Sequence, residues 1–487
     1  METEYKWVVL SNTTLGVLMS SLDTNIVLIA LPDIGRAVPG MTTLDLLWVL
    51  LGYQLVIACV LVNFGRLSDM FGRVRLYNMG FALFTIGSGL CSISRTPEEL
   101  IGFRIVQAIG SGFLFSNSAA IITDAFPPEE RGMALGINQV SIVVGSVAGL
   151  VLGGVLSQTL GWQSIFWVNL PIGAFATIWA HLKLKELSTP SHTRNLDISG
   201  NLTFAGGVLL LLLGLTLYAI AGLSVLYTAL TLASSAILLA AFVYIDSHRR
   251  DPMFDLTLFR NREFTSGNET IFLNALARGS FTLVMVFYLQ GPIMGMSAEQ
   301  AGIFLIPVSV SLSILGPISG ILSDRFGQKM FVIGGLLLSS VGFLLMTRIG
   351  YGLTLTGVLL PFILIGAGMG MFASPNRSSI MNSVPGHRRG VASGISTTLT
   401  NVGNTVSIGL AFILMSTTTS RSTLDAIFSG FSAKGSIFDA GGFIYSVHTV
   451  FYISALMLVV SIFLYLHGLR KKSPSIAKSS GIKNADN

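Results

Sequence analysis

The sequence predicts an all-α protein that crosses a membrane many times. Only 11% of its 487 residues are charged and 52% are hydrophobic, whereas soluble globular proteins carry roughly 25% charged residues. The apolar residues occur in runs of about 20, the length that an α-helix needs to cross the hydrocarbon core of a bilayer. The basic residues between these runs fall mainly in alternate loops, which is typical of a polytopic helical membrane protein.

The apolar runs, bounded by charged or turn-rich loops, predict fourteen transmembrane helices. The first run begins near Trp7, extends to about Leu31 and lacks a small-residue cleavage pattern, so we expect a membrane span rather than a signal peptide. The predicted spans are 8–31, 46–66, 75–93, 98–122, 132–157, 162–182, 200–220, 224–245, 264–290, 299–322, 330–349, 354–380, 390–417 and 442–468.

The positions of the 29 Lys and Arg residues test this count of helices. Most of them fall in loops on one predicted side, and the alternation holds along the whole chain. Because cytoplasmic loops carry the excess of Lys and Arg, we expect a cell-membrane protein with both termini in the cytoplasm. The exceptions lie on the other side or inside spans, and they are Arg36, Arg95, Arg348, Arg421 and Lys434, and Arg104 and Arg278.

Several function classes are excluded by what the sequence lacks. There is no P-loop, no H-E-x-x-H and no G-x-S-x-G, so we expect neither an ATP-driven pump nor an enzyme. Cys59 and Cys91 fall inside apolar runs and predict neither a disulfide framework nor a metal site. The net charge of +6 resides in alternate loops, so no nucleic-acid partner is expected, and nothing indicates an obligate protein partner or a cofactor.

Two motifs occur twice in the chain. GRLSDMFGRVR, at 65–75, is repeated as GILSDRFGQKM, at 320–330, with an offset of 255 residues. PPEERGMALGINQVSIVVG, from Pro127, resembles VPGHRRGVASGISTTLTNVG, from Val384, and their shared glycines are offset by 258 residues. Two markers in the same order at nearly the same offset indicate duplicated halves, a plan known from transporters.

The duplication predicts the domain organisation. Each half holds six helices, with the first motif after its second helix and the other before its fifth. We expect an N-terminal bundle at 1–185, a two-helix insertion with a linker at 186–262, a C-terminal bundle at 263–470 and a basic cytoplasmic tail at 471–487.

Several motifs resemble the major facilitator superfamily, specifically its fourteen-helix drug:proton antiporter branch. GRLSDMFGRVR is similar to the signature of the loop between helices two and three, RIVQAIGSG at 104–112 to that of the fourth helix, and SLDTNIVLIALPDIG at 21–35 to that of the first helix. The resemblance implies two pseudo-symmetric six-helix bundles around a central cavity, which work by alternating access.

The predicted fifth helix resembles the antiporter motif of this branch, which implies export. GSVAGLVLGG keeps the glycines of that motif but has Leu150 where the family has proline, so the direction of transport stays open. The small face for close helix packing is retained, while a proline bend is lost. The glycines concerned are Gly145, Gly149, Gly153 and Gly154.

Asp23 lies inside the first predicted span, where an ionised side chain costs roughly 2.5–3.5 kcal/mol on insertion scales. At 100° per residue, Asn12, Gly16 and Met19 fall within about 40° of it and form a small or polar stripe. We interpret the stripe as a cavity face and Asp23 as the carboxylate that binds the transported proton. The alternative is a structural Asp that forms a hydrogen bond at a helix contact.

Arg104 is predicted to pair with Asp23. Each lies roughly 10 Å from the outer end of its span, estimated at 1.5 Å per residue, and a buried Arg needs a partner. Protonation of Asp23 would then weaken its hold on Arg104 and rearrange the cavity. The alternative is a static buried ion pair.

The ninth predicted span carries two further charges. Arg278 is near its middle, with Asn274 on the same side, and we expect both in the substrate cavity together with Asn12 of the first span. Glu269 is nine residues from Arg278 and therefore on the opposite face. It either binds a cationic drug or a second proton, or it pairs with Arg262 near the interface.

The duplicated motif predicts a turn on the cytoplasmic side. We expect positive φ or close backbone approach at Gly65, Gly72, Gly320 and Gly327. The resemblance implies that the turn latches the two bundles together when this side is closed. The first copy carries the fuller charge set, with Asp69, Arg73, Arg75 and the expected partners Asp124, Glu129 or Glu130, next to Arg131. The second copy has Asp324 and Lys329, with Gln328 in place of Arg73. The alternative for both copies is that their charges serve only as topology signals.

Three functions are consistent with these features. The first is a secondary transporter that exports hydrophobic or cationic small molecules in exchange for protons, with the proton gradient as its energy source and the bilayer as its surroundings. The second is a facilitator or importer of a small solute, which the missing proline favours. The third is a membrane sensor or scaffold, which needs neither paired buried charges nor a duplicated bundle.

Overall fold

The fold was obtained as a computed structural model that carries the complete sequence. It describes residues 2–127, 130–187, 197–218, 224–249, 252, 254–350, 354–385, 388–420, 423–424 and 440–469. Every regular element in these residues is helical, and fourteen helical segments are long and apolar enough to cross a membrane. The expected number of spans is therefore confirmed, while the basic tail at 471–487 lies outside the described residues.

The N-terminal half supplies the first six spans. The sixth span is divided at Val168 into two helices. The elements are α1 (Glu2–Ala37), α2 (Thr43–Phe71), α3 (Arg73–Ile93), α4 (Pro97–Ala125), α5 (Arg131–Leu160), α6 (Ser164–Trp167) and α7 (Asn169–Lys183).

The insertion and the C-terminal half supply the other eight spans. The ninth span is divided at Gly279 and Ser280. The elements are α8 (Ile198–Thr216), α9 (Val225–His248), η2 (Leu256–Arg260), α10 (Arg262–Arg278), α11 (Phe281–Gln290), α12 (Ala298–Phe326), α13 (Gln328–Met346), α14 (Leu355–Asn382), α15 (Arg389–Thr418) and α17 (Ala440–Leu469).

Helix caps repeat between the two halves. The hydroxyls of Thr42 and Ser297 cap α2 and α12, each with a complete capping box, and Thr96 and Thr354 cap α4 and α14. These caps satisfy backbone N–H groups that a helix start leaves free. Their spacings, 255 and 258 residues, equal those of the repeated motifs, so the duplication extends to local helix initiation.

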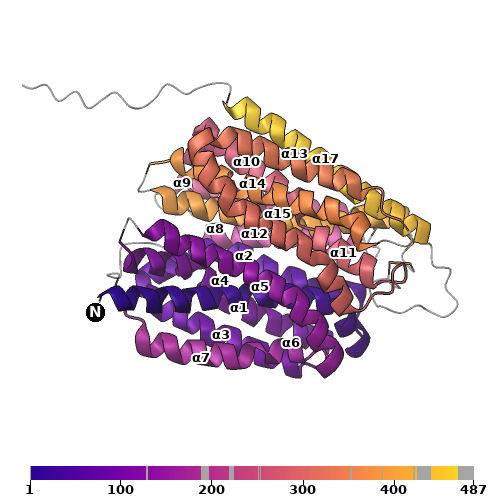
Figure 1. The fold of residues 1–487 in the computed structure, drawn as a ribbon, viewed down its shortest axis with the longest axis horizontal. Coiled ribbons are helices and arrows are strands. Elements are labelled where there is room, and N and C mark those ends of the chain that lie inside the picture. Colours follow the sequence, from indigo (N-terminus) through magenta and orange to yellow (C-terminus); the bar gives the residue numbers. More distant parts are fainter. Residues whose placement is uncertain are drawn as a thin grey trace, which may run out of the picture.

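Figure 1 shows the two halves as separate layers, with the purple α1–α7 below and the orange and yellow C-terminal helices above. We call the end that carries the start of α1, the α2–α3 and α12–α13 turns and the end of α17 the basic face, and the opposite end the far face. The insertion lies at the seam between the layers, because α8 packs on both α2 and α15.

Candidate functional site

A cavity of about 1280 Å³ lies between the two halves. Its lining includes Arg66 and Asp69 near the end of α2 and Arg388 just before α15, so it reaches the basic face. Deeper in, it is lined by Thr24 of α1 and Arg278 at the end of α10. The volume exceeds the roughly 300–1,000 Å³ of common ligand pockets.

The far face is closed by contacts between the halves. A Cβ placed on Gly154 of α5 would lie 2.5 Å from the backbone nitrogen of Glu299 in α12, and one on Gly302 of α12 would lie 2.4 Å from the carbonyl oxygen of Leu150. In addition, Nε2 of Gln290 donates to the carbonyl of Ile29 at 3.0 Å. Only residues without a side chain permit such close backbone approach.

The other three glycines of the predicted antiporter motif in α5 pack against α1. A Cβ on Gly145 or Gly149 would lie 2.5 Å from the carbonyl oxygens of Leu18 and Leu22 respectively, and one on Gly153 would also meet α1. The small face that the sequence predicts is therefore present, and it is divided between two partners. α5 remains one continuous helix through Leu150.

Asp23 is completely buried in the N-terminal half. Its Oδ2 accepts a hydrogen bond from Nη1 of Arg104 at 2.6 Å, and its Oδ1 accepts from the amides of Gln107 at 2.8 Å and Asn169 at 2.9 Å. The predicted pairing with Arg104 is present. The carboxylate joins α1 to α4 and α7 through charge-assisted hydrogen bonds, which are stronger than neutral ones.

Arg104 has further partners. Its Nη1 also donates to Oε1 of Gln107 at 2.6 Å, and its Nε donates to the carbonyl of Val49 at 3.4 Å. The ring of Tyr53 lies 4.1 Å from the guanidinium carbon, a cation–π arrangement. Because Tyr53 lines the cavity and Arg104 does not, the ring separates the ion pair from the cavity.

From the sequence, no role is predicted for Gln107, Asn169 or Tyr53. Gln107 follows Arg104 by three residues, so helical spacing places both on one face, and this signal is readable. Asn169 and Tyr53 come from α7 and α2, and only the packing of these helices brings them to Asp23 and Arg104.

Arg278 lines the cavity, as the sequence predicts, and so does Arg377 of α14, which falls within the predicted span 354–380 but is not among the residues expected in the cavity. Nη2 of Arg377 donates to the hydroxyls of Ser393 and Thr397, at 3.3 and 3.1 Å. Within the described part of the chain, no carboxylate pairs with either arginine.

Three residues expected in the cavity lie elsewhere. Glu269 is exposed on the face of α10 opposite Arg278 and is absent from the lining. Asn12 is fully buried near α3, where Tyr77 donates to its carbonyl. Asn274 is buried one turn before Arg278 and does not line the cavity either. Helical phase selects a face but does not reveal which helix covers it.

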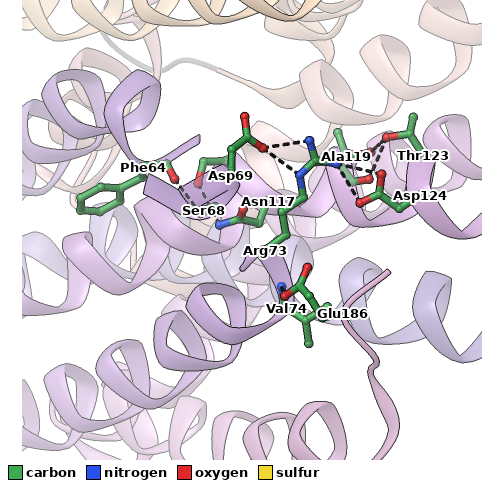
Figure 2. Close-up of polar contacts among 12 residues, drawn as sticks. Phe64, Ser68, Asp69, Arg73, Val74, Asn117, Ala119, Thr123, Asp124 and Glu186 are labelled. Carbon is green, nitrogen blue, oxygen red and sulfur yellow. Dashed lines mark hydrogen bonds and ion pairs between the residues drawn. The ribbon is translucent and has the colours of Figure 1, made fainter. Parts of the chain in front are cut away.

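The α2–α3 turn holds Arg73 between two carboxylates (Figure 2). Its Nη1 donates to both oxygens of Asp124 at 2.8 Å, and its Nη2 donates to Asp69 at 2.9 Å. These bonds join the ends of α2, α3 and α4. The carboxylate of Glu186 accepts the N–H of Val74 at 2.9 Å and so caps the start of α3.

The other expected members of this turn have different surroundings. Of the partners expected for Arg73, Glu130 pairs with Lys6 instead, and Glu129 lies outside the described residues. Nε of Arg131 donates to the carbonyl of Phe126 at 3.0 Å, and Arg75 is exposed.

Only one glycine of each motif copy adopts a turn conformation. Gly72 and Gly327 have φ of 103° and 90°, whereas Gly65 and Gly320 are helical, so the expectation of positive φ is wrong for those two. The physical reason is that α2 and α12 run on to Phe71 and Phe326, which leaves one residue to reverse the chain. A Cβ on Gly320 would lie 2.6 Å from the hydroxyl of Ser374, so its close approach is to a neighbouring helix.

The second copy replaces the ion pair by a neutral bond. Nε2 of Gln328 donates to the hydroxyl of Ser378 of α14 at 2.9 Å, where the first copy has Arg73 and Asp124. Lys329 is exposed, and the side chain of Asp324 lies outside the described residues. The two copies therefore share geometry but differ in charge.

Comparison with known proteins assigns a family. The model of the Major Facilitator Superfamily matches residues 13–408 and 270–485. The riboflavin transporter RibZ of Clostridioides difficile is 33% identical over 84% of this chain and 87% of its own length. The multidrug resistance protein Stp of Mycobacterium tuberculosis is 32% identical over 81% of this chain and 73% of its own length.

A further relative and a solved structure are also similar to this chain. The tetracenomycin C resistance and export protein of Streptomyces glaucescens is 28% identical over 84% of this chain and 76% of its own length. A crystal structure of a bacterial homologue of the lysosomal transporter Spinster, in an inward-facing conformation, aligns with a TM-score of 0.66 and 16% identity over 95% of this chain and 97% of that chain. At this identity, the likeness shows the fold.

Proposed function

Because the chain belongs to the major facilitator superfamily of membrane transporters, where its relatives include multidrug resistance proteins, we propose that it exports hydrophobic small molecules in exchange for protons. The observation that carries the proposal is the buried pair of Asp23 and Arg104 beside the cavity. An ionisable pair inside a span is costly, and it marks a proton or substrate pathway. The cell membrane is the proposed location.

The proposed orientation places the basic face in the cytoplasm. The excess of Lys and Arg in the loops of this face supports the assignment. The cavity then reaches the cytoplasm while the far face is closed, which makes this conformation inward-facing. Alternating access requires a second conformation in which the far face is open and the basic face is closed.

Proton binding to Asp23 is the proposed coupling step. A neutral carboxyl loses its charge-assisted bond to Arg104, while Gln107, Val49 and Tyr53 still hold the guanidinium. α1 is then less tightly joined to α4 and α7. Because α1 packs on the glycine face of α5, and α5 closes the far face against α12, the change reaches the far face through direct contacts.

The expectation of cationic substrates is not part of this proposal. The two carboxylates among the described lining residues, Asp69 and Asp255, each pair with an arginine, Arg73 and Arg388 respectively. Neither offers an unpaired negative charge to a bound cation.

The test is transport in inside-out vesicles with an acidic interior. We expect a dye or drug to accumulate, the accumulation to collapse with a protonophore, and both effects to vanish in Asp23→Asn. Asp33→Asn is a matched control, because Asp33 is also on α1 but pairs with Arg36 near the far face. Gradient-driven transport that persists unchanged in Asp23→Asn would remove Asp23 from the mechanism.

A second candidate, a facilitator or importer, is favoured by one observation. α5 runs unbroken through Leu150, the position at which the antiporter motif has proline. In this case the substrate equilibrates across the vesicle membrane with no pH gradient and in the presence of the protonophore. The same vesicles therefore distinguish the two candidates.

A further inference from the structure

Only some of the arginines that line the cavity pair with a carboxylate of the described residues. Arg73 pairs with Asp69 and Asp124, Arg388 pairs with Asp255, and Arg249 pairs with Asp197. A fourth arginine, Arg66, donates to the carbonyl of Pro252. Arg278 and Arg377 remain, and no carboxylate among the described residues pairs with them.

These two arginines lie at different depths. Arg377 is five residues from the basic-face end of α14, about 8 Å along the helix axis. Arg278 is sixteen residues from the basic-face end of α10, about 24 Å along the axis. A solute entering from the basic face therefore meets two positive charges that no carboxylate of the described residues compensates, one near the mouth and one near the middle of the membrane.

The break in the ninth span explains how a lone cation is tolerated so deep. Arg278 is in the last turn of α10, where the helix dipole carries partial negative charge. The backbone N–H of Ser280 in the break is satisfied by the hydroxyl of Ser407 at 3.0 Å. Such broken helices are tolerated where they line a cavity.

A buried polar atom without a partner in the described residues lies at the same place. Gly279 packs against the backbone of Asn404, whose Oδ1 is buried and has no hydrogen-bond partner in the described residues. Asn404 lines the cavity, as do Asn401 one turn earlier on α15 and Tyr53 on the opposite side. The closed end of the cavity thus combines a guanidinium that pairs with no described carboxylate, amides and an aromatic ring.

We propose that the cavity binds an amphipathic organic anion, whose carboxylate, sulfonate or phosphate pairs with Arg278. Arg377 attracts the anion on its way in from the basic face. This assignment names the substrate class for the proposed transport function and rests on it. The volume of about 1280 Å³ accommodates a molecule of several rings, and the partly exposed Phe115 in the lining supplies aromatic surface for them.

The test compares two dyes with the same ring skeleton and opposite charge. Fluorescein is anionic and rhodamine 123 is cationic, and binding of each to the purified full-length protein is followed by fluorescence anisotropy at one neutral pH, without any gradient. We expect fluorescein to bind about tenfold more tightly or better, since charge-assisted bonds to a guanidinium are strong. Equal binding of the two dyes, or tighter binding of rhodamine 123, would overturn the proposal.

Variants locate the site. Arg278→Gln should raise the Kd for fluorescein about tenfold or more, while Arg278→Lys should restore part of the loss because it keeps the charge. Arg377→Gln should mainly slow association, since a charge at the mouth acts by steering. Arg95→Gln, an exposed arginine beyond the cavity at the far-face end of α3, is the matched control. Fluorescein binding unchanged in a well-folded Arg278→Gln, judged by a monodisperse elution profile, contradicts the assignment.

Two further experiments distinguish a lipid headgroup from a soluble anion as the ligand, and anion binding from proton-driven transport. Binding is repeated in nanodiscs of phosphatidylcholine, with and without phosphatidylglycerol, because a lipid headgroup carries the same chemistry. Loss of fluorescein binding with phosphatidylglycerol would assign the site to lipid and overturn the substrate claim. Selective anion binding without proton-driven flux would contradict the proposed function alone, and proton-driven flux of rhodamine 123 but not fluorescein would contradict this inference alone.

Discussion

Asp23 and Arg104 form the buried pair on which the proposed mechanism depends. Each is at most 1% exposed, and their charged atoms are 2.6 Å apart. The free energy cost of removing both charges from water is offset by their attraction and by the amides of Gln107 and Asn169. A pair of this kind is not a source of stability, but each charge depends on the other.

A double-mutant cycle tests this dependence. Arg104→Gln leaves Asp23 buried without its counter-charge, so we expect a loss of about 3–5 kcal/mol in the free energy of unfolding. Asp23→Asn combined with Arg104→Gln removes both charges and should recover most of that loss. Thermal unfolding of the detergent-solubilised protein measures stability, and proton-driven flux is measured on the same samples. A double variant as unstable as Arg104→Gln alone would contradict the mutual dependence, and one that regains flux would contradict proton coupling at Asp23.

The first charged turn and its copy are joined to their neighbouring helices by different kinds of bond. Arg73 joins α2, α3 and α4 through Asp69 and Asp124, whereas Gln328 makes a neutral bond to α14. The charged pair is about one quarter exposed, and pairs of this kind stabilise a fold by about 1 kcal/mol or less. The ion pair would therefore contribute to transport by stabilising the second conformation of the cycle, rather than by stabilising the fold.

Asp69→Asn should slow flux by about tenfold, equivalent to ~1.4 kcal/mol, while membrane insertion and unfolding temperature stay close to the parent. Asp324→Asn, the same change in the second copy, should have a smaller effect because Gln328 supplies no matching charge. Flux in inside-out vesicles, normalised to the amount of inserted protein, gives the comparison. Normal flux in Asp69→Asn would reduce the motif to a topology signal.

The glycines of α5 bring this helix into close contact with two neighbours, α1 and α12. Gly154→Val would place its Cβ 2.5 Å from the backbone of Glu299, which cannot move aside as a side chain would. We expect the far face to be forced open and the population to shift away from the conformation in which the far face is closed. Spin labels at Arg36→Cys, in the last turn of α1, and at Arg348→Cys, just after α13, would report longer distances because both residues are exposed at the far face.

Gly136→Val is the matched control for this experiment. It is the same substitution on the same helix, but a Cβ at Gly136 has no atom of another element within 4 Å. Distances that change equally in both variants, or in neither, would show that the Gly154 contact does not hold the far face closed.

At the scale of the whole molecule, the insertion bridges the two halves. The amide of Asn201 in α8 donates to the carbonyl of Cys59 in α2 at 2.7 Å, and Arg249 closes the hairpin on Asp197. The contact of α8 itself with α15 of the C-terminal half is apolar, with Leu215 packed on Gly409. Since polar bonds specify one arrangement and apolar contacts allow sliding, we expect α8 to move with the N-terminal half.

A disulfide between Leu215→Cys and Gly409→Cys tests this expectation. A Cβ at Gly409 would lie 3.3 Å from that of Leu215, close to the ~3.5–4.5 Å of natural disulfides. Oxidation should abolish flux and reduction should restore it, because the crosslink joins α8 to the half it slides past. The single-cysteine variants, oxidised in parallel, are the controls. Full flux in the crosslinked protein would assign the insertion to the C-terminal half instead.

Much of the fold follows from the sequence by itself. Apolar runs of membrane-spanning length, alternating charge and repeats at 255 and 258 residues determine the number of helices and the duplication. A helical membrane protein must satisfy its backbone hydrogen bonds within each spanning segment, so the secondary structure of these segments does not depend on how the helices pack. The pairing of Asp23 with Arg104 was predictable for the same reason, because a buried charge must find the opposite charge at its own depth.

The tertiary structure decided which faces meet. Helical phase placed Asn12 beside Asp23 and Glu269 opposite Arg278, but only packing shows that Asn12 lies against α3 and that Glu269 is outside the cavity. Arg377 falls within the predicted span 354–380, but only the packing of α14 shows that it lines the cavity. Local sequence encodes helices and buried charges because the membrane penalises every unsatisfied group, whereas the lining of the cavity depends on contacts between helices hundreds of residues apart.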